Sequence, residues 1–395
     1  MLSRGHFAFI NLAHFSVHYL LLIFPTAVLA IQKDWRWSYA DTLGLGTAGL
    51  VVFALATLPM GWLGDRLPRN WLMAAFFLGG GTACALTGLA PDKTWLMLGL
   101  AGIGLFAAIY HPIGLAMIAD RPARQGNALA INGVFGNLGL AGATIGTGLI
   151  AGYYGWRAAF IVPGIAVALI GLVYLVLFGW AKRPAPQNVV GNFARPQNRP
   201  AQVYIVILIA TSALFGGFIF NGVTVSLPKV IEERILDHGM ELQRVGILSA
   251  VIFAMAAFAQ LPVGAALDRF GAKPVLLILL TIQCAAMLVL ANAQGAVVFV
   301  LFIVLVTAMF AELPVTSWLL ARFIAAKWRS RAYAMEYVFS LGVSSLIIPL
   351  IAALHQGAAG FRSMFMLLAG AAAIVAVVAV FLPDTSRRAT LSAPV

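Results

Sequence analysis

Charged residues are scarce in this chain of 395 amino acids. Asp, Glu, Lys and Arg together make up 10% of it, whereas a soluble domain carries roughly 25%. Apolar residues make up 62%, well above the roughly 45–50% of soluble domains. A water-soluble fold cannot hide that much apolar surface. We therefore expect lipid to be the solvent for most of the chain.

The sequence contains only two cysteines. Cys84 and Cys284 lie in separate apolar runs, without the spacing of a zinc site or a disulfide framework. We interpret both as small buried hydrophobic residues. A Walker-type phosphate loop is also missing from the sequence, which excludes ATP as the direct energy source.

The net charge of +12 is distributed in a way that argues against binding to nucleic acid. Counted from a cytoplasmic N-terminus, alternate loops collect the cations: Arg66, Arg69, Arg121, Arg124, Lys182, Arg183, Arg195, Arg199, Arg269, Lys273, Lys327, Arg329, Arg331, Arg387 and Arg388. The opposite loops hold fewer cations (among them Lys229 and Arg234), and acids such as Glu232 and Glu233 dilute them. This bias predicts a multi-pass protein of the inner membrane with both termini in the cytoplasm.

Twelve apolar runs approach the roughly 20 residues that a membrane-spanning helix needs. They cover residues 7–31, 40–60, 71–90, 94–119, 127–152, 157–180, 202–228, 241–263, 272–291, 295–321, 332–354 and 361–382. We predict an all-α polytopic membrane protein. Residues 1–180 form one six-helix half, 181–201 a polar cytoplasmic linker, and 202–395 the second half with a short tail.

Two sequence patterns each occur once in either half. The first is Leu58-Pro59-x-Gly61-x-x-x-Asp65-Arg66, which returns as Leu261-Pro262-x-Gly264-x-x-x-Asp268-Arg269. The second is Gly155-Trp156-Arg157-x-x-Phe160, which returns as Gly360-Phe361-Arg362-x-x-Phe365. The matches indicate two homologous halves. Such repeats are typical of transporters whose substrate site lies between the halves near the bilayer midplane.

With these patterns the chain resembles the major facilitator superfamily. The run Gly61-Trp62-Leu63-Gly64-Asp65-Arg66-Leu67-Pro68-Arg69 is similar to the superfamily's loop between helices two and three. The segment from Gly264 to Lys273 is similar to the corresponding loop of the second half, and Gly155 to Phe160 resembles the start of helix six. The resemblance implies a twelve-helix fold of two pseudo-symmetric halves, alternating access, no enzymatic activity and no cofactor. Two covalently joined halves make a monomer the expected state.

A narrower resemblance is to the fosmidomycin-resistance branch of exporters. It rests on Gly102-Ile103-Gly104, Tyr110-His111-Pro112, His14 and Pro68. It implies proton-coupled efflux of a small organic solute. The chain departs from the superfamily in two places: helix four lacks the arginine expected near Leu98, and Gly142-Ala143-Thr144-Ile145-Gly146 lacks the proline of many antiporters. Uptake of a small metabolite therefore stays an alternative.

By the same resemblance, the repeated turn is expected to act as a conformational latch between the halves. We assign this role to Gly61, Asp65, Arg66 and Arg69, and in the second copy to Asp268 and Arg269. An aspartate can face the positive end of a neighbouring helix. An arginine can donate to a carboxylate or carbonyl across the interface. The alternative is that these loop charges only set the orientation in the membrane.

Histidines inside the first and fourth helices are candidates for a substrate or proton site. His14 and His18 are one turn apart and share a helix face. His111 lies between Tyr110, also a candidate, and Pro112, which favours a kink. Ionisable groups within a membrane usually face a cavity, and histidine binds protons, carboxylates or transition metals. The alternative is a set of neutral histidines satisfied by hydrogen bonds between helices.

Glu312 is the only acidic residue deep within an apolar run. An unpaired carboxylate in lipid can carry a proton, so we expect H+ to be the coupling ion. A substrate cation or an internal pair is the alternative partner for this carboxylate. Asn132, Asn221 and Tyr337 are further candidates for lining the site.

Three alternatives to a solute transporter are a membrane-embedded enzyme, a metal-ion transporter and a transporter-like receptor. A membrane-embedded enzyme needs a metal or nucleophile constellation. Two histidines at i and i+4 with a carboxylate could hold a metal, but the helix that would carry a general base beside them is missing, so we do not predict an enzyme and assign no metal ligands. A metal-ion transporter that uses the histidines would depend on the metal. A transporter-like receptor would bind its ligand without flux.

Overall fold

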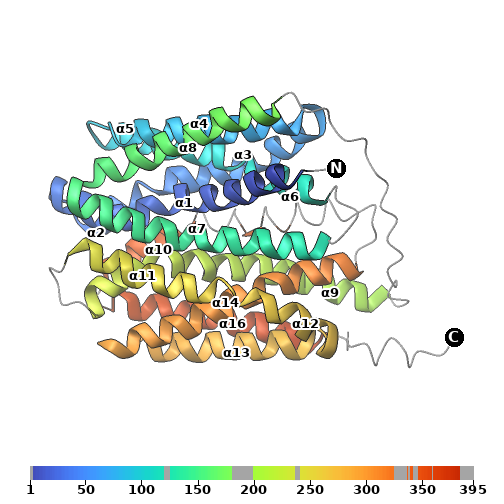
Figure 1. The fold of residues 1–395 in the computed structure, drawn as a ribbon. Helices are drawn as coiled ribbons and strands as arrows, with labels where there is room; N and C mark the ends of the chain where they lie inside the picture. The colour runs from blue at the N-terminus through green and yellow to red at the C-terminus, as the bar shows by residue number, and fades with distance from the viewer. Residues whose placement is uncertain are drawn as a thin grey trace.

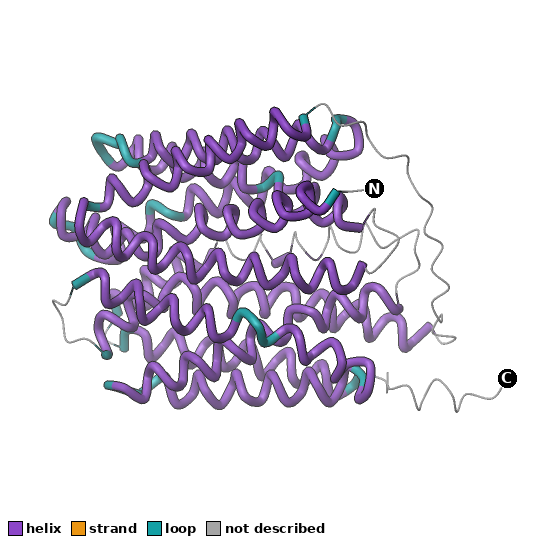
Figure 2. Tube along the Cα trace, viewed as in Figure 1, coloured by secondary structure: helices purple, strands orange, loops and turns teal. Residues whose placement is uncertain are grey.

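The computed structural model describes residues 3–119, 125–179, 199–235, 241–323, 336, 339–340, 346–357 and 359–382. Throughout these ranges every regular element is a helix, as Figure 2 shows. Eleven helical segments in this part of the chain are long and apolar enough to cross a membrane. A shorter apolar helix spans Leu346–Gln356. The predicted all-α membrane fold is thus confirmed.

The helices of the N-terminal half are α1 (Arg4–Trp35), α2 (Tyr39–Gly44), α3 (Thr47–Arg66), α4 (Arg69–Thr87), α5 (Lys93–Ala107), α6 (Tyr110–Ala119), α7 (Gln125–Tyr154) and α8 (Trp156–Phe178). Those of the C-terminal half are α9 (Arg199–Thr211), the π-helix η1 (Ser212–Gly216), α10 (Gly217–Arg234), α11 (Leu242–Ala256), α12 (Gln260–Phe270), α13 (Ala272–Leu290), α14 (Ala296–Phe323), Leu346–Gln356 and α16 (Phe361–Val380).

The helices run side by side in one bundle, with the N-terminal half in the upper part of Figure 1 and the C-terminal half below it. The halves meet where α1 and α7 contact α10 and α11. We call the face where α1 begins and α3 ends the N-terminal face. The opposite face, where α1 ends, α2 begins and α10 ends, is the distal face.

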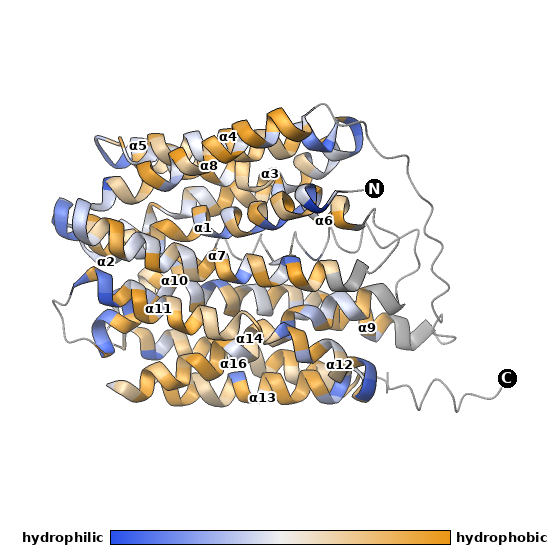
Figure 3. Ribbon diagram, in the orientation of Figure 1, coloured by the Kyte–Doolittle hydropathy of each residue, from blue (hydrophilic) through white to orange (hydrophobic). Residues whose placement is uncertain are grey.

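Apolar residues predominate along the helices, as the hydropathy colours of Figure 3 show, and many of their side chains are exposed on the surface. Leu55 is 72% exposed and Val176 is 76% exposed, which a protein surrounded by water rarely tolerates in such number. Lipid tails satisfy these side chains, while the helices satisfy their own backbone groups. The surface therefore agrees with the membrane environment that the composition predicts.

Glycines bring the two halves into backbone contact. A Cβ placed on Gly148 of α7 would lie 2.8 Å from the Cα of Gly246 in α11. Any larger residue at either position would push the helices apart. Small residues at such crossings provide the close packing that holds helices together in lipid.

Proline coincides with a break in two of the membrane-crossing segments, the fourth (Lys93–Ile118) and the eighth (Leu242–Phe270). Pro112 has no N–H to donate to the carbonyl of Ala108, and the helix is interrupted between α5 and α6 at that point. Pro262 stands in the same relation to Phe258, between α11 and α12. By contrast, Pro314 lies inside the continuous helix α14. Only the N-terminal half therefore has a break beside a histidine.

Candidate functional site

Three predicted histidines form one cluster inside the N-terminal half. His14 and His18 come from α1, and His111 comes from α6; one ring nitrogen of each lies within 4.8 Å of those of the other two. The ring centroids are 5.1 Å apart for His14 and His18, and 5.5 Å apart for each pair with His111. His14 is buried, and the other two are partly exposed. We call this set the histidine cluster.

The orientation of His14 is fixed by its neighbours. Its Nδ1 lies 2.7 Å from the backbone oxygen of Asn132. A carbonyl oxygen only accepts, so Nδ1 must donate, and in the neutral ring the lone pair is then on Nε2. The ring of Tyr110 stacks on the imidazole at a centroid distance of 4.8 Å. A Cβ at Gly136 would lie 2.5 Å from Nε2, so only glycine leaves room for the ring.

Asn132 joins three helices beneath the histidine cluster. The hydroxyl of Tyr110 donates to its Oδ1 at 3.0 Å, and its Nδ2 donates to Oδ1 of Asn11 at 2.9 Å. Asn11, Tyr110 and Asn132 are all buried, so these bonds form without competing water. The sequence identified Tyr110 and Asn132, but their pairing became visible only in the fold.

Replacing Asn132 with Leu is expected to destabilise the protein. Interhelical polar bonds in a membrane contribute about 0.6 kcal/mol on average and at most about 1.7. Two such bonds are lost, so the free energy of unfolding should fall by about 1–3 kcal/mol. Thermal unfolding of the purified protein in detergent measures this loss. Asn137→Leu on the same helix is the control, because the described residues supply no hydrogen-bond partner to its Nδ2; an equal loss in both variants would contradict the account.

Glu312 lies buried in the C-terminal half against an irregular stretch of helix. Its Oε2 accepts a hydrogen bond of 2.7 Å from Nε2 of Gln283 on α13. A Cβ on Gly216, the last residue of η1, would lie 3.8 Å from its Oε1. π-Helical segments are rare and often occur at functional sites. Glu312 is thus an acid with one amide partner beside a deformable segment.

Asn221 and Tyr337 were also predicted to line the site. The Nδ2 of Asn221 donates to the carbonyl of Gly217 in its own helix, at 2.9 Å. Tyr337 lies outside the described residues.

The predicted latch residues lie at the N-terminal face. The guanidinium of Arg66 lies 3.5 Å from the ring centroid of Trp62, and that of Arg269 lies 5.0 Å from the ring centroid of Phe270. Asp268 accepts a 3.1 Å hydrogen bond from Nε1 of Trp318. Each of these contacts stays within one half. Asp65 is exposed at the end of α3, Arg69 begins α4, and Gly61 faces Pro112 of α6.

A network of charges connects the halves at the distal face. Lys229 of α10 lies 2.7 Å from Glu232 and 3.3 Å from Glu233. Lys33 of α1, from the other half, lies 3.6 Å from Glu232. His355 in turn contacts Glu233 at 2.8 Å. We call these five residues the distal network.

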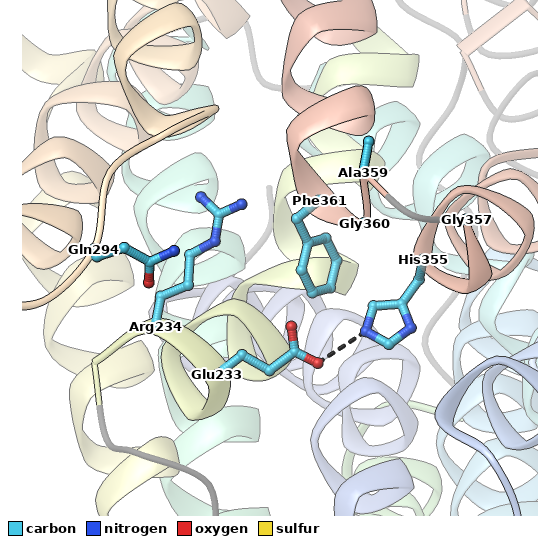
Figure 4. Close-up of a pocket in the computed structure, with 8 residues that line it drawn as sticks. All are labelled: Glu233, Arg234, Gln294, His355, Gly357, Ala359, Gly360 and Phe361. Carbon is cyan, nitrogen blue, oxygen red and sulfur yellow. Dashed lines mark hydrogen bonds and ion pairs between the residues drawn. The ribbon is translucent and has the colours of Figure 1, made fainter.

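Aromatic contacts and a pocket extend the distal network. The ring of Tyr39, from α2, lies 4.9 Å from that of His355 and 5.3 Å from Nζ of Lys229. Figure 4 shows the bond between Glu233 and His355 at one side of a pocket of about 350 Å³. Arg234, Gln294 and Phe361 complete its wall. The contact between the halves is therefore polar, and this pocket lies beside it, within the C-terminal half.

The apolar run that ends at residue 228 predicts a loop at Lys229, Glu232 and Glu233. This prediction is wrong. In the structure α10 continues to Arg234. The charges remain in a helix because the i,i+3 and i,i+4 spacings let Lys229 neutralise both acids. This spacing in Lys-Val-Ile-Glu-Glu was the available signal.

These features define a multi-pass membrane protein: two halves made of apolar helices, polar clusters buried in each half, and a charged contact between them. A sequence model described as the Major Facilitator Superfamily matches residues 8–242 and 235–395. The chain belongs to this superfamily. The matches with three curated relatives span only 30%, 31% and 33% of those proteins' own length.

Curated relatives are similar over varying lengths. The multidrug resistance protein MdtG of Citrobacter koseri is 25% identical over 334 residues, which are 80% of this chain and 78% of that protein. The puromycin resistance protein pur8 of Streptomyces alboniger is 32% identical over 150 residues, and the match spans only 30% of its length. The 4-hydroxybenzoate transporter PcaK of Pseudomonas putida is 21% identical over 280 residues, 62% of each chain.

Two solved structures share the fold. A D-xylose–proton symporter superposes with a TM-score of 0.75 at 15% identity, covering 96% of this chain and 98% of its own. A bacterial homologue of the human lysosomal transporter Spinster, in an inward-facing and occupied conformation, has a TM-score of 0.70 at 17% identity, covering 95% of this chain and 93% of its own. At these identities the likeness shows the fold alone.

Proposed function

We propose that this transporter exports a small organic solute by alternating access, coupled to protons. The observation that carries the mechanism is where the halves touch. Lys33 with Glu232, Tyr39 with His355, and Gly152 with Gln243 all meet at the distal face. The halves also touch at Gly133 and Gln260, farther from this face. Polar contacts concentrated toward one face are what rocking halves make in one of their two end states.

The distribution of Lys and Arg indicates which face of the protein lies on the cytoplasmic side of the membrane. The positive-inside bias puts the N-terminal face in the cytoplasm. The structure then represents the state closed to the outside. Arg66, Asp268 and Arg269 have their contacts within their own halves in this state. A latch between the halves must lose its cross-half contacts when the cytoplasmic side opens.

Export is supported by the relatives and by the polar residues. The names of MdtG and pur8 refer to drug resistance, and the chain resembles them over 80% and 37% of its length. Glu312 is the residue we assign to proton coupling, because it is a buried acid with a single amide donor on its Oε2. Uptake is the second candidate, favoured by the likeness to PcaK, which is a named transporter of 4-hydroxybenzoate.

The experiment is a transport assay on a panel of compounds, fosmidomycin included. Cells that express the protein are loaded with each compound, and retention is followed with and without a proton gradient. We expect gradient-dependent loss of at least one compound from these cells relative to cells with an empty vector. Gradient-dependent accumulation would overturn export in favour of uptake.

The latch yields a separate expectation. Asp65→Asn should slow transport about tenfold, because losing roughly 1.4 kcal/mol of latch energy lowers the population of the state closed at the N-terminal face by that factor. Thermal stability should stay unchanged, since Asp65 is exposed. Initial transport rates in proteoliposomes measure the effect. Glu241→Gln, at the distal face, is the control, and an equal rate in both variants would remove Asp65 from the mechanism.

A further inference from the structure

The histidine cluster has the donor set of a transition-metal site. Imidazole nitrogens suit Zn²⁺, Cu²⁺, Ni²⁺ and Co²⁺, and His14, His18 and His111 each offer one within 4.8 Å of the others. A tetrahedral ion with Zn–N bonds of about 2.0–2.1 Å brings its ligands to about 3.3 Å from one another. Side-chain rotations that move each ring nitrogen by about an ångström would bring the three nitrogens to this spacing.

The surroundings of His14 are those of a metal ligand. Metal-binding histidines almost always donate their second ring N–H to a carbonyl or carboxylate, which fixes the tautomer. His14 makes this bond through Nδ1 to the carbonyl of Asn132, at 2.7 Å. Its Nε2 therefore keeps its lone pair for an ion. Tyr110 and Gly136 hold the ring in place.

The exposure of the histidine cluster and its position within one half also fit an exchangeable ion. His18 and His111 are partly exposed, so an ion can reach the cluster without unfolding a helix. All three histidines belong to the N-terminal half. An ion bound there does not tie the halves together, and the rocking motion stays possible. Three protein ligands leave one tetrahedral position for water or for an anionic group of a solute.

We propose that His14, His18 and His111 bind one divalent transition-metal ion inside the N-terminal half. The proposal rests on the geometry of the histidine cluster and stands apart from the direction and coupling of transport.

Metal binding is tested on the full-length protein in detergent, after removal of any affinity tag. Zn²⁺ is titrated against a chromophoric chelator, and Co²⁺ is added separately as a spectroscopic probe. We expect one equivalent of Zn²⁺ and the visible absorption of tetrahedral Co²⁺. His111→Ala should weaken Zn²⁺ binding at least 100-fold and remove the Co²⁺ bands. Gly136→Ala, which displaces the ring of His14 without removing a ligand, should weaken binding about 10- to 100-fold, as losses of outer-shell support do.

Two histidines outside the histidine cluster serve as matched controls. His6 bonds to Tyr174, and His355 bonds to Glu233, so His6→Ala and His355→Ala should bind Zn²⁺ like the wild type. If His111→Ala does not fold, His18→Gln replaces it, with thermal unfolding as the check. Absence of binding to folded wild-type protein, or equal binding by the wild type and the folded cluster variant, overturns the proposal. Binding is measured without a membrane gradient, so a failure of proton-coupled export leaves this result unaffected.

Discussion

Glu312→Gln is expected to abolish transport driven by a proton gradient, by about 100-fold or more. Glutamine keeps the size of the side chain and its acceptor oxygen toward Gln283, but it cannot take up or release a proton. The carboxylate is buried in α14 and bonded to Gln283 at 2.7 Å. An ionisable group held inside a membrane is costly, and such groups usually serve proton or substrate pathways.

The variant separates proton coupling from solute binding. Proteoliposomes that carry Glu312→Gln should show no transport when only a pH gradient is imposed. Exchange of labelled for unlabelled solute should continue, because exchange needs no net proton movement. Glu241→Gln, at the start of α11, should retain both activities. Full gradient-driven transport by Glu312→Gln would place the coupling site elsewhere in the chain.

The second large effect is expected from Lys229→Met at the distal face. The side chains of Lys229 and Glu232 are only 10% and 6% exposed, so loss of the ammonium leaves two neighbouring acids poorly compensated. Breaking a buried ion pair costs about 3–5 kcal/mol. We expect the lower end, about 3 kcal/mol, because Lys33 and His355 still contact the acids. The state closed at the distal face should lose about 100-fold in population.

Cysteine labelling measures this shift. Ala30 lines a pocket formed by both halves near Lys33 and Glu232. In a background without Cys84 and Cys284, a membrane-impermeant maleimide should label Ala30→Cys much faster when Lys229→Met is present. Lys93→Met is the control, because Lys93 is an exposed cation that starts α5 of the N-terminal half. Unchanged labelling would show that the distal network does not hold the halves closed.

The sequence was sufficient to predict the membrane-crossing helices that the structure describes, because long apolar runs are local signals. Of the predicted helix at 332–354, the structure describes residues 336, 339–340 and 346–354. The sequence was also sufficient to place His14 and His18 on one helix face, since that depends only on helical spacing. The approach of His111 depends on how α6 packs against α1, which no spacing within one helix encodes. The same holds for the bond between Gln283 and Glu312. The sequence did not reveal the distal network, because its charged residues after position 228 were interpreted as a loop. Paired charges can instead form the last turn of a membrane helix.

The two halves have diverged in their buried chemistry. In the described part of the chain, the histidine cluster belongs to the N-terminal half, and the buried Glu312 belongs to the C-terminal half. The proline break beside His111 has no counterpart at Pro314, which lies in a continuous helix. A repeated fold therefore holds a possible ligand site in one half and an acid in the other. This division fits a transporter whose halves bind different species.

In the proposed mechanism, transport requires the distal contacts to open. A Cβ on Gly152 of α7 would lie 2.4 Å from Cδ of Gln243 on α11, so the two positions are in contact across the halves. Gly152→Cys with Gln243→Cys, oxidised to a disulfide, tests whether a cross-link between the halves blocks transport. Gly102→Cys with Ala83→Cys is the control within one half, where the Cβ atoms lie 3.3 Å apart. Both pairs are made in the background without Cys84 and Cys284, and transport is measured before and after reduction. We predict that the oxidised cross-half pair is inactive and recovers on reduction, while the control pair is active throughout; full transport by the oxidised cross-half pair would contradict alternating access through the distal face.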